Sequence, residues 1–265
     1  MAPSSPTPPL AVVTGGNGGI GFALAARRAQ AGHHLLIVAR DEGRLTEAAT
    51  ALAQAHGVPV ETTCCDLADS AQTEDLAARL GALAPDILVN NAGFGAYGPF
   101  SDLSPAVASA MIATNVAALT RLTAAVLPAM RARGSGRILN VASTAAFGPV
   151  PFAALYGASK AFVLSFSAAL AEELEGAGIT VTALCPGPTV TRFAERAGMD
   201  HSGAFQGHLT SAEMVADRGF AALMAGRRTE VPGLANQLMT LSTRFVPRAA
   251  VARVTGRFMR ERTRS

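Results

Sequence analysis

Tyr156 and Lys160 are the residues of this sequence whose types and spacing most clearly suggest chemistry. Lys160 is the only lysine among 22 lysines and arginines, and it lies four residues after Tyr156, one of two tyrosines. Residues four apart share one face of a helix. Arginine is a permanently charged planar fork, whereas lysine is a compact ammonium whose protonation can be tuned. The pair is therefore a candidate for proton transfer.

A glycine-rich segment near the start of the chain predicts a dinucleotide site. Residues 10–14 form a short apolar run that indicates a strand, and residues 22–31 indicate a helix. Glycines between a strand and a helix let the backbone approach a pyrophosphate at the helix N-terminus. The alternative is a glycine-rich turn without a ligand. The residues expected to contact the cofactor here are Gly15, Asn17, Gly18, Gly19, Ile20 and Gly21.

The end of the second predicted strand indicates which cofactor binds. An acidic residue there would bind the ribose 2′-hydroxyl of NAD, but the sequence reads Val38-Ala39-Arg40. The guanidinium of Arg40 can pair with a 2′-phosphate. We therefore expect NADP(H) to be preferred over NAD(H). The alternative is that Arg40 is a solvated residue at the end of a strand.

The order of elements predicts an α/β fold, a Rossmann-type doubly wound parallel sheet in a single domain. Apolar, β-branched runs alternate with helical segments, and such alternation places helices on both faces of a parallel sheet. We expect a loose tail at 1–9, an NADP-binding catalytic domain at 10–235 and a substrate loop at about 188–210. The expected strands are 10–14, 34–39, 58–65, 86–89, 137–141, 179–184 and 228–233, with a helix at 211–225.

Composition restricts the class of protein. Hydrophobic residues make up 49% of the 265 residues and charged residues 15%, which fits one well-buried domain. We expect three reduced cysteines, no signal peptide, no membrane span and a cytoplasmic location. The histidines show no metal-ligand spacing, so we expect no metal. They are His33, His34, His56, His201 and His208.

Residues 236–265 are unlike the rest of the chain. They contain seven arginines and one glutamate, and apolar residues between these arginines predict a basic amphipathic helix over 238–259. This helix could close the substrate pocket, pack on a second subunit or lie on an anionic membrane surface. Nucleic-acid binding is not expected, because no nucleic-acid-binding motif is present.

Several motifs together resemble one known family. Residues 14–21, Asn90-Asn-Ala-Gly93, the Tyr156/Lys160 pair and Pro186-Gly187 occur in the order seen in short-chain dehydrogenases/reductases. Asn115 and Ser143 also stand in the family's order. The resemblance covers about residues 10–235, and the basic C-terminal tail makes it most similar to the DltE-like branch.

This resemblance implies a catalytic tetrad. Tyr156 would give a proton to the substrate carbonyl, and Lys160 would reach the nicotinamide ribose. The ammonium of Lys160 and an oxidised nicotinamide would together lower the pKa of this tyrosine. Ser143 would hydrogen-bond the carbonyl oxygen. Asn115 would hold a water that links the lysine to solvent, unless it is only a packing detail of its helix.

The resemblance also extends the cofactor site. Tyr156 and Lys160 would border the cofactor, and Asp66 would lie near the adenine, with a helix N-cap as its alternative role. Val190 would contact the nicotinamide carboxamide through its backbone, and Thr191 through its hydroxyl. The further cofactor residues are Asn91, Ala92, Gly93, Pro186 and Gly187.

The function expected from these residues is an NADP(H)-dependent oxidoreductase that interconverts a carbonyl (ketone, aldehyde or acyl-type) and an alcohol. Aromatic residues in the loops favour an apolar small-molecule substrate. The alanine-rich segments 115–133 and 152–176 resemble those through which the family forms homodimers or homotetramers. The alternative is a non-catalytic protein that binds NADP and senses redox state. The aromatic residues are Phe94, Tyr97, Phe100, Phe147, Phe152, Phe193 and Phe205.

Overall fold

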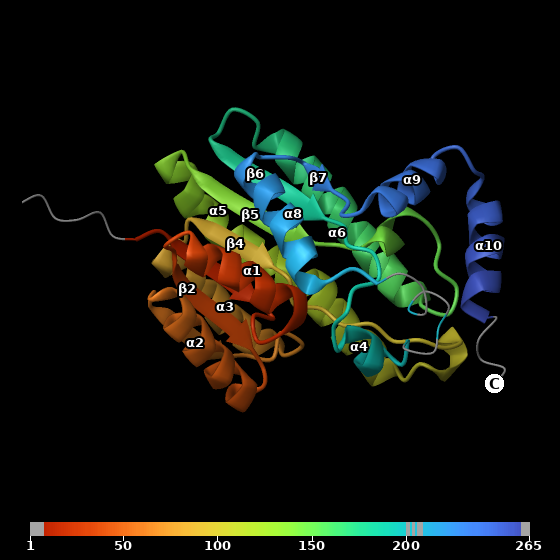
Figure 1. Ribbon diagram of the computed structural model, residues 1–265, viewed down its shortest axis with the longest axis horizontal. Coiled ribbons are helices and arrows are strands. Elements are labelled where there is room, and N and C mark those ends of the chain that lie inside the picture. The colour runs from red at the N-terminus through yellow and green to blue at the C-terminus, as the bar shows by residue number, and fades with distance from the viewer. Residues whose placement is uncertain (1–7, 200–201, 203–204, 206–208, 261–265) are drawn as a thin grey trace, which may run out of the picture.

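A parallel β-sheet forms the centre of the molecule (Figure 1). The computed structural model describes residues 8–199, 202, 205 and 209–260. Within them the sheet has seven strands in the order β3-β2-β1-β4-β5-β6-β7, which confirms the predicted doubly wound fold. The order reverses between β1 and β4, where such sheets bind their ligands. The strands are β1 (Leu10–Thr14), β2 (His34–Ala39), β3 (Val60–Cys64), β4 (Ile87–Asn90), β5 (Gly136–Val141), β6 (Ile179–Leu184) and β7 (Thr229–Glu230).

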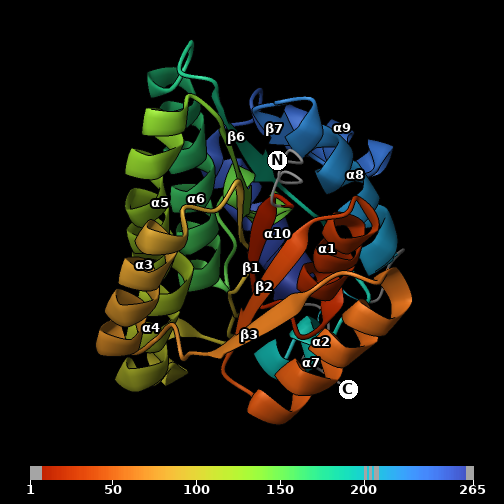
Figure 2. The same cartoon turned by 90° about the vertical axis from the view of Figure 1, so that its left-hand side faces the viewer.

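Helices cover both faces of the sheet (Figure 2). Along β1 the side chains alternate: Val13 packs in the core on the side of α1, α2 and α8, while Val12 packs on the side of α3, α5 and α6. Strands buried on both faces read as continuous apolar runs, which is why the sequence made them visible. The helices of the first layer are α1 (Gly19–Gln30), α2 (Glu42–His56) and α8 (Ala212–Met224), and those of the second are α3 (Ser70–Leu83), α4 (Pro105–Ile112), α5 (Leu119–Arg133) and α6 (Ala154–Glu173).

Several of these helices begin at short polar side chains that accept hydrogen bonds from the first turn. Asp41 caps α2 by accepting from Arg44 N, and Asp69 caps α3 by accepting from Ala71 N and Gln72 N. Such caps satisfy amide groups that lack a partner within the helix.

The remaining helical segments lie above the carboxyl ends of the strands or at the C-terminus. The predicted helix at 115–133 begins earlier, at Pro105, and its middle is a π-helical segment that contains Asn115.

Two segments of the described chain, Pro105–Arg133 and Ala154–Glu173, are apolar and long enough to cross a membrane, yet here they are layers of the fold packed beside the sheet. The further segments are η1 (Phe100–Asp102), η2 (Ala113–Ala118), η3 (Thr144–Phe147), α7 (Phe193–Ala197), α9 (Leu234–Ser242) and α10 (Arg248–Arg260).

The prediction of one continuous helix over 238–259 is wrong. The structure has α9 and α10, with residues 243–247 between them. Pro247 has no backbone N–H and its ring disfavours the helical conformation of the preceding residue, so a break between two helices is favoured here. The last predicted strand, 228–233, is also shorter, because only Thr229–Glu230 pairs with β6.

Candidate active site

One large pocket lies at the carboxyl ends of the strands. It has a volume of about 1240 Å³ and extends from the glycine loop before α1 to the two C-terminal helices. Most of the predicted site residues border it. Those that do are Gly15, Asn17, Gly18, Gly19, Ile20, Gly21, Arg40, Asp66, Asn91, Ala92, Gly93, Ser143, Tyr156, Lys160, Pro186, Gly187 and Thr191.

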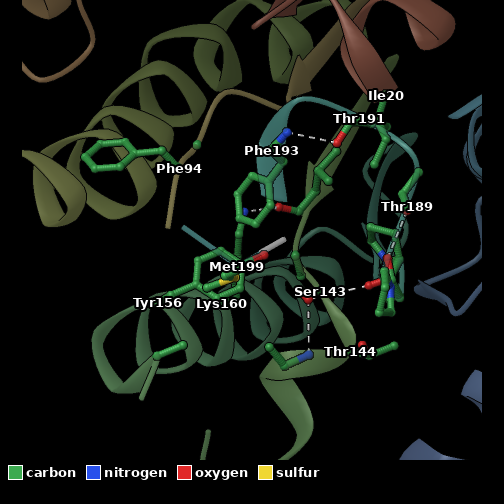
Figure 3. A pocket seen from close by; sticks show the side chains of 18 of the residues that line it. Ile20, Phe94, Ser143, Thr144, Tyr156, Lys160, Thr189, Thr191, Phe193 and Met199 are labelled. Atoms are coloured by element: carbon green, nitrogen blue, oxygen red, sulfur yellow. Dashed lines mark hydrogen bonds between the residues drawn. The ribbon is translucent and has the colours of Figure 1, made fainter. Parts of the chain in front are cut away.

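Tyr156, Lys160 and Ser143 meet in the middle of this pocket (Figure 3). Helix α6 places Tyr156 and Lys160 one turn apart, and Ser143 follows the end of β5. The Ser143 hydroxyl acts on the pKa of Tyr156, and it donates to Pro186 O at 3.5 Å and accepts from Ala145 N at 3.1 Å. Lys160 Nζ donates to Val141 O at 2.7 Å and lies 5.9 Å from the centre of the Tyr156 ring. The side chain of Phe193 packs beside Tyr156, with 5.3 Å between the ring centres.

Burial moves the pKa values of the pair in opposite directions. It raises the pKa of Tyr156 to about 12, against a smaller lowering by the hydrogen bond from Ser143. It lowers the pKa of Lys160 to about 8, against a smaller raising by Cys185. Burial rather than Lys160 sets the direction of the Tyr156 pKa shift here, and the lowering expected from the ammonium together with an oxidised nicotinamide stays a prediction. The lysine points to the Val141 carbonyl, and desolvation of the phenolate is the larger effect.

Asn115 lies behind the pocket rather than in it. Its Nδ2 donates to Phe94 O at 2.9 Å and to Ser159 Oγ at 3.0 Å, and its Oδ1 accepts from Phe94 N at 3.1 Å. The side chain is 1% exposed. The alternative interpretation, a hydrogen-bonded packing residue, describes these contacts. A Cβ on Gly93 would lie 3.0 Å from Asn115 Oδ1 and 3.3 Å from Lys160 Nζ, so both side chains border this glycine.

The glycine loop has the shape that a bound dinucleotide needs. Gly15 and Gly19 have φ angles of +66° and +54°, which favour glycine, and a Cβ on Gly21 would lie 2.2 Å from Gly15 O. No side chain caps the first turn of α1. Free amide groups at a helix N-terminus bind phosphate, so the loop fits a pyrophosphate. Asn91 supports this loop by donating from Nδ2 to Thr14 O at 2.9 Å and to Gly15 O at 3.2 Å.

Arginines gather at the far end of the loop. Arg40 is exposed at the pocket edge. Sequence reasoning missed Arg44, whose Nη2 donates to Asn17 O at 3.4 Å and whose Nη1 is buried without a hydrogen-bond partner. It also missed Arg196, whose pKa is lowered by burial and then by the nearby charges of Arg44, Arg192 and Arg40. The spacing of four between Arg40 and Arg44, at the start of a helix, was the available signal.

The predicted roles of Asp66 and Val190 need corrections. Asp69, not Asp66, is the N-cap of α3, so the alternative role for Asp66 is wrong. Asp66 instead borders the pocket and accepts from Ala68 N at 3.0 Å. Val190 is 61% exposed and does not border the pocket, and its N–H already donates to Thr210 O at 2.9 Å. The bridge between Thr189 and Thr210 therefore occupies the N–H of Val190, one of the two backbone groups that could have made the expected contact.

The other half of the pocket is lined by apolar side chains with a few hydroxyl and amide groups among them. Of the predicted aromatic residues, Phe94, Phe147, Phe193 and Phe205 border it, but Tyr97, Phe100 and Phe152 do not. In Figure 3 the side chain of Phe94 points away from Tyr156. The wall contributed by α9 and α10 was predicted only as one of three alternatives. It consists of Asn236, Met239, Thr240, Ser242, Val251, Val254, Thr255, Phe258 and Met259, with Thr243 and Val246 from the connection.

The remaining cysteines and histidines form no recognisable centre in the described part of the chain. Cys64, Cys65 and Cys185 are free thiols, and no group of three or more histidine, cysteine or acidic side chains is placed to hold a metal there. His201 and His208 lie outside the described residues.

Comparison with known proteins decides the family. The family model described as short chain dehydrogenase matches residues 9–201. The chain belongs to this family. It is 38% identical over 234 residues to a protein described as a ketoacyl reductase of the granaticin polyketide synthase of Streptomyces violaceoruber, which covers 86% of this chain and 84% of that protein.

Solved structures agree with this assignment. A short-chain dehydrogenase from Sphingobium yanoikuyae in complex with NADPH is 35% identical, with a TM-score of 0.82 over 89% of this chain and 93% of that chain. A bulky-bulky ketone specific alcohol dehydrogenase from Comamonas testosteroni is 30% identical, with a TM-score of 0.78 over 89% and 92%. This short-chain dehydrogenase is therefore an oxidoreductase that acts on CH–OH or C=O groups and uses a nicotinamide cofactor.

Proposed function

We propose that the protein is an NADP(H)-dependent reductase of ketones with bulky apolar substituents. The observation that carries this proposal is that Ser143, Tyr156 and Lys160 border one pocket, with Lys160 one helical turn from Tyr156, between the glycine loop and a largely apolar wall. A carbonyl placed beside these hydroxyls would meet a hydrogen-bond donor, a proton donor and a nearby cation.

Each residue of the proposed tetrad has a separate task. When bound, NADPH supplies the hydride. With a pKa near 12, Tyr156 keeps its proton at neutral pH and can give it to the oxygen of the substrate as that oxygen gains charge. The hydroxyl of Ser143 stabilises that developing charge. The ammonium of Lys160 favours the tyrosinate that remains, and Asn115 holds the Phe94 segment and Ser159 beside it.

The proposed preference for NADP(H) rests on the arginines at the end of the glycine loop. Arg40 is at the surface, whereas Arg44 lies beside the loop and its buried Nη1 has no hydrogen-bond partner. The charges of both arginines contribute to lowering the pKa of Arg196. A buried guanidinium N–H without an acceptor is costly, and a phosphate would supply that acceptor. A 2′-phosphate therefore fits this corner better than a ribose hydroxyl.

The bulky substrate class is supported by the lining of the pocket and by two relatives. Phe147, Met199, Val254 and Phe258 present apolar surface to the same pocket as Tyr156. The similar alcohol dehydrogenase from Comamonas testosteroni is described as specific for bulky-bulky ketones, and the similar protein from Streptomyces violaceoruber as a ketoacyl reductase. Membership of the DltE-like branch stays a prediction.

We also propose a homodimer or homotetramer in the cytoplasm. The rings of Phe162 and Phe166 stack on α6 with centres 5.8 Å apart, and Phe162 is 39% exposed. An exposed aromatic pair on a long apolar helix is suited to pairing with a second copy. Contact with a membrane surface through the C-terminal segment is a less favoured alternative.

The test is NADPH oxidation with a panel of ketones of increasing bulk. We expect turnover that falls by about 10³-fold in Tyr156→Phe, which removes the proton donor but keeps the ring. The affinity for NADPH, measured by fluorescence titration, should change little in this variant. A protein that binds NADPH tightly but oxidises it with no ketone would instead support the alternative of a redox-sensing protein.

A further inference from the structure

Tyr97, the tyrosine outside the proposed tetrad, holds the last turn of α10. Its hydroxyl donates to the carbonyl oxygen of Met259 at 2.5 Å. Carbonyl groups in the last turn of a helix have no partner within that helix, so this hydrogen bond supplies one. The side chain of Met259 is 4% exposed and packs in the apolar cluster that also contains Tyr156. The end of α10 is thus tied to the neighbourhood of the proton donor.

Phe152 completes this attachment from the loop before α6. Its φ angle is +65°, a region that a phenylalanine rarely adopts, and its carbonyl accepts from Gly98 N at 2.8 Å. Its ring centre lies 6.3 Å from that of Tyr97 and 5.5 Å from the guanidinium carbon of Arg260. A strained backbone persists only where its surroundings fix it, and such positions gather at ligand sites. Phe152 and Tyr97 therefore form one platform under the end of α10.

The rest of α10 touches the same loop. A Cβ on Gly256 would lie 3.3 Å from Pro151 Cγ, and a Cβ on Gly148 would lie 2.9 Å from Val251 Cγ1. Figure 1 shows α10 at the edge of the molecule, away from the sheet, and joined to α9 by a short connection. Its position therefore depends on the 148–152 loop and on Tyr97 rather than on the central core.

The same helix also borders the pocket. Val254 and Phe258 border it, one helical turn apart, yet they are 68% and 49% exposed. Apolar side chains gain free energy when a ligand removes them from water. These two residues are therefore placed to contact an apolar group of the substrate, provided that α10 stays where Tyr97 holds it.

We propose that Tyr97 is a positioning residue that sets substrate specificity. By fixing the last turn of α10, it places Val254 and Phe258 against the bulky apolar substituent of the ketone. The part of this inference that concerns the substrate rests on the proposed function, whereas the attachment of α10 does not. The reduction of small ketones that do not reach α10 does not depend on Tyr97.

The kinetic test compares Tyr97→Phe with the unchanged protein on a bulky aryl ketone and on a small water-soluble ketone. We expect KM for the bulky ketone to rise by about three- to tenfold, as for the loss of one hydrogen bond, with kcat and the small ketone changed less than about twofold. Phe100→Leu is the matched control, because Phe100 lies in the same loop region, is 64% exposed and does not border the pocket. Equal changes for both ketones, or none, overturn the proposal.

Limited trypsin digestion tests the attachment without any substrate. Arg253 and Arg257 are exposed on α10, and cleavage there requires the helix to open. We expect Tyr97→Phe to speed cleavage at these sites by about three- to tenfold, read by mass spectrometry, with cleavage elsewhere unchanged. Gly256→Val, which pushes α10 from Pro151, should have the same two effects. An unchanged cleavage rate in both variants would show that Tyr97 does not hold α10, and would overturn the inference. If instead the unchanged protein reduces no ketone, the claim about substrate specificity is overturned together with the proposed function.

Discussion

The two halves of the pocket are built in different ways. The half toward the glycine loop consists largely of backbone at strand ends and helix starts, held by hydrogen bonds such as those from Asn91 to Thr14 and Gly15. The half toward α10 consists of apolar side chains from segments far apart in the sequence, and Val254 and Phe258 remain largely exposed there. A backbone cradle tolerates few substitutions, whereas an apolar wall can change its shape by exchanging side chains. The first half suits an invariant cofactor, and the second suits a variable substrate.

The largest effect that tests this contrast is expected from Gly21→Ala. Because the added Cβ would lie 2.2 Å from Gly15 O, the loop must deform, and we expect NADPH affinity to fall by about 100-fold or more. Fluorescence titration measures this change. Gly43→Ala is the matched control, because its Cβ would meet only Asp41 Oδ1, at 3.8 Å. Unchanged NADPH affinity in Gly21→Ala would contradict a rigid backbone cradle.

Arg44→Ala should separate the two cofactors. We expect it to weaken NADPH binding by about 10- to 100-fold, as for the loss of a charge-assisted hydrogen bond, and to change NADH binding by less than about threefold. Parallel titrations with both cofactors measure the ratio. Arg79→Ala provides a control, since Arg79 pairs with Glu61 at 3.0 Å and does not border the pocket. Equal losses for the two cofactors would show that Arg44 supports the loop rather than the 2′-phosphate.

The pH dependence of kcat/KM tests the roles of Lys160 and Tyr156, which lie where the two halves of the pocket meet. Since burial lowers the pKa of Lys160 to about 8, the ammonium is present below that pH and is lost above it. The pKa of Tyr156, near 12, keeps the tyrosine protonated over the same range. We expect kcat/KM for ketone reduction to be level below about pH 8 and to fall toward tenfold per pH unit above it.

The control for this fall above pH 8 is the kcat/KM of the Lys160→Met variant, measured from pH 6 to 10. Its activity should be low and should lack the fall above pH 8, because no titrating ammonium remains. Lys160→Arg keeps the charge, but the larger planar guanidinium has little room beside Gly93, so it should also lose activity. A wild-type profile that stays level to pH 10 would contradict the assignment to Lys160.

The smallest effect is expected in the apolar half. Phe258→Ala removes a ring that is already 49% exposed, so we expect KM for a bulky ketone to rise only about three- to tenfold. NADPH affinity should not change, which steady-state kinetics with each substrate varied in turn can show. An equal loss of NADPH affinity would mean that the two halves are not separable.

The difference between the two halves of the pocket also explains which features the sequence could predict. The glycine loop, Arg40 and the Tyr156/Lys160 pair are local patterns, and each strand buried on both faces is visible as an apolar run, so the fold order and the cofactor half followed from them. Val190 lies outside the pocket, and its N–H pairs with Thr210 from a distant part of the loop, which no local pattern indicates. The raised pKa of Tyr156 could not be predicted either, because it comes from desolvation in the assembled pocket.

By itself the sequence determined the doubly wound fold and the set of residues that could carry proton transfer, because both depend on short-range spacing and on the periodicity of apolar residues. Only the tertiary structure decided that Arg44 and Arg196 join Arg40, that Asn115 lies behind the pocket, and that Tyr97 holds α10 beside Tyr156. These contacts join segments separated by up to 162 residues. Such contacts are set by packing of the whole chain, which leaves no periodic signal in the sequence.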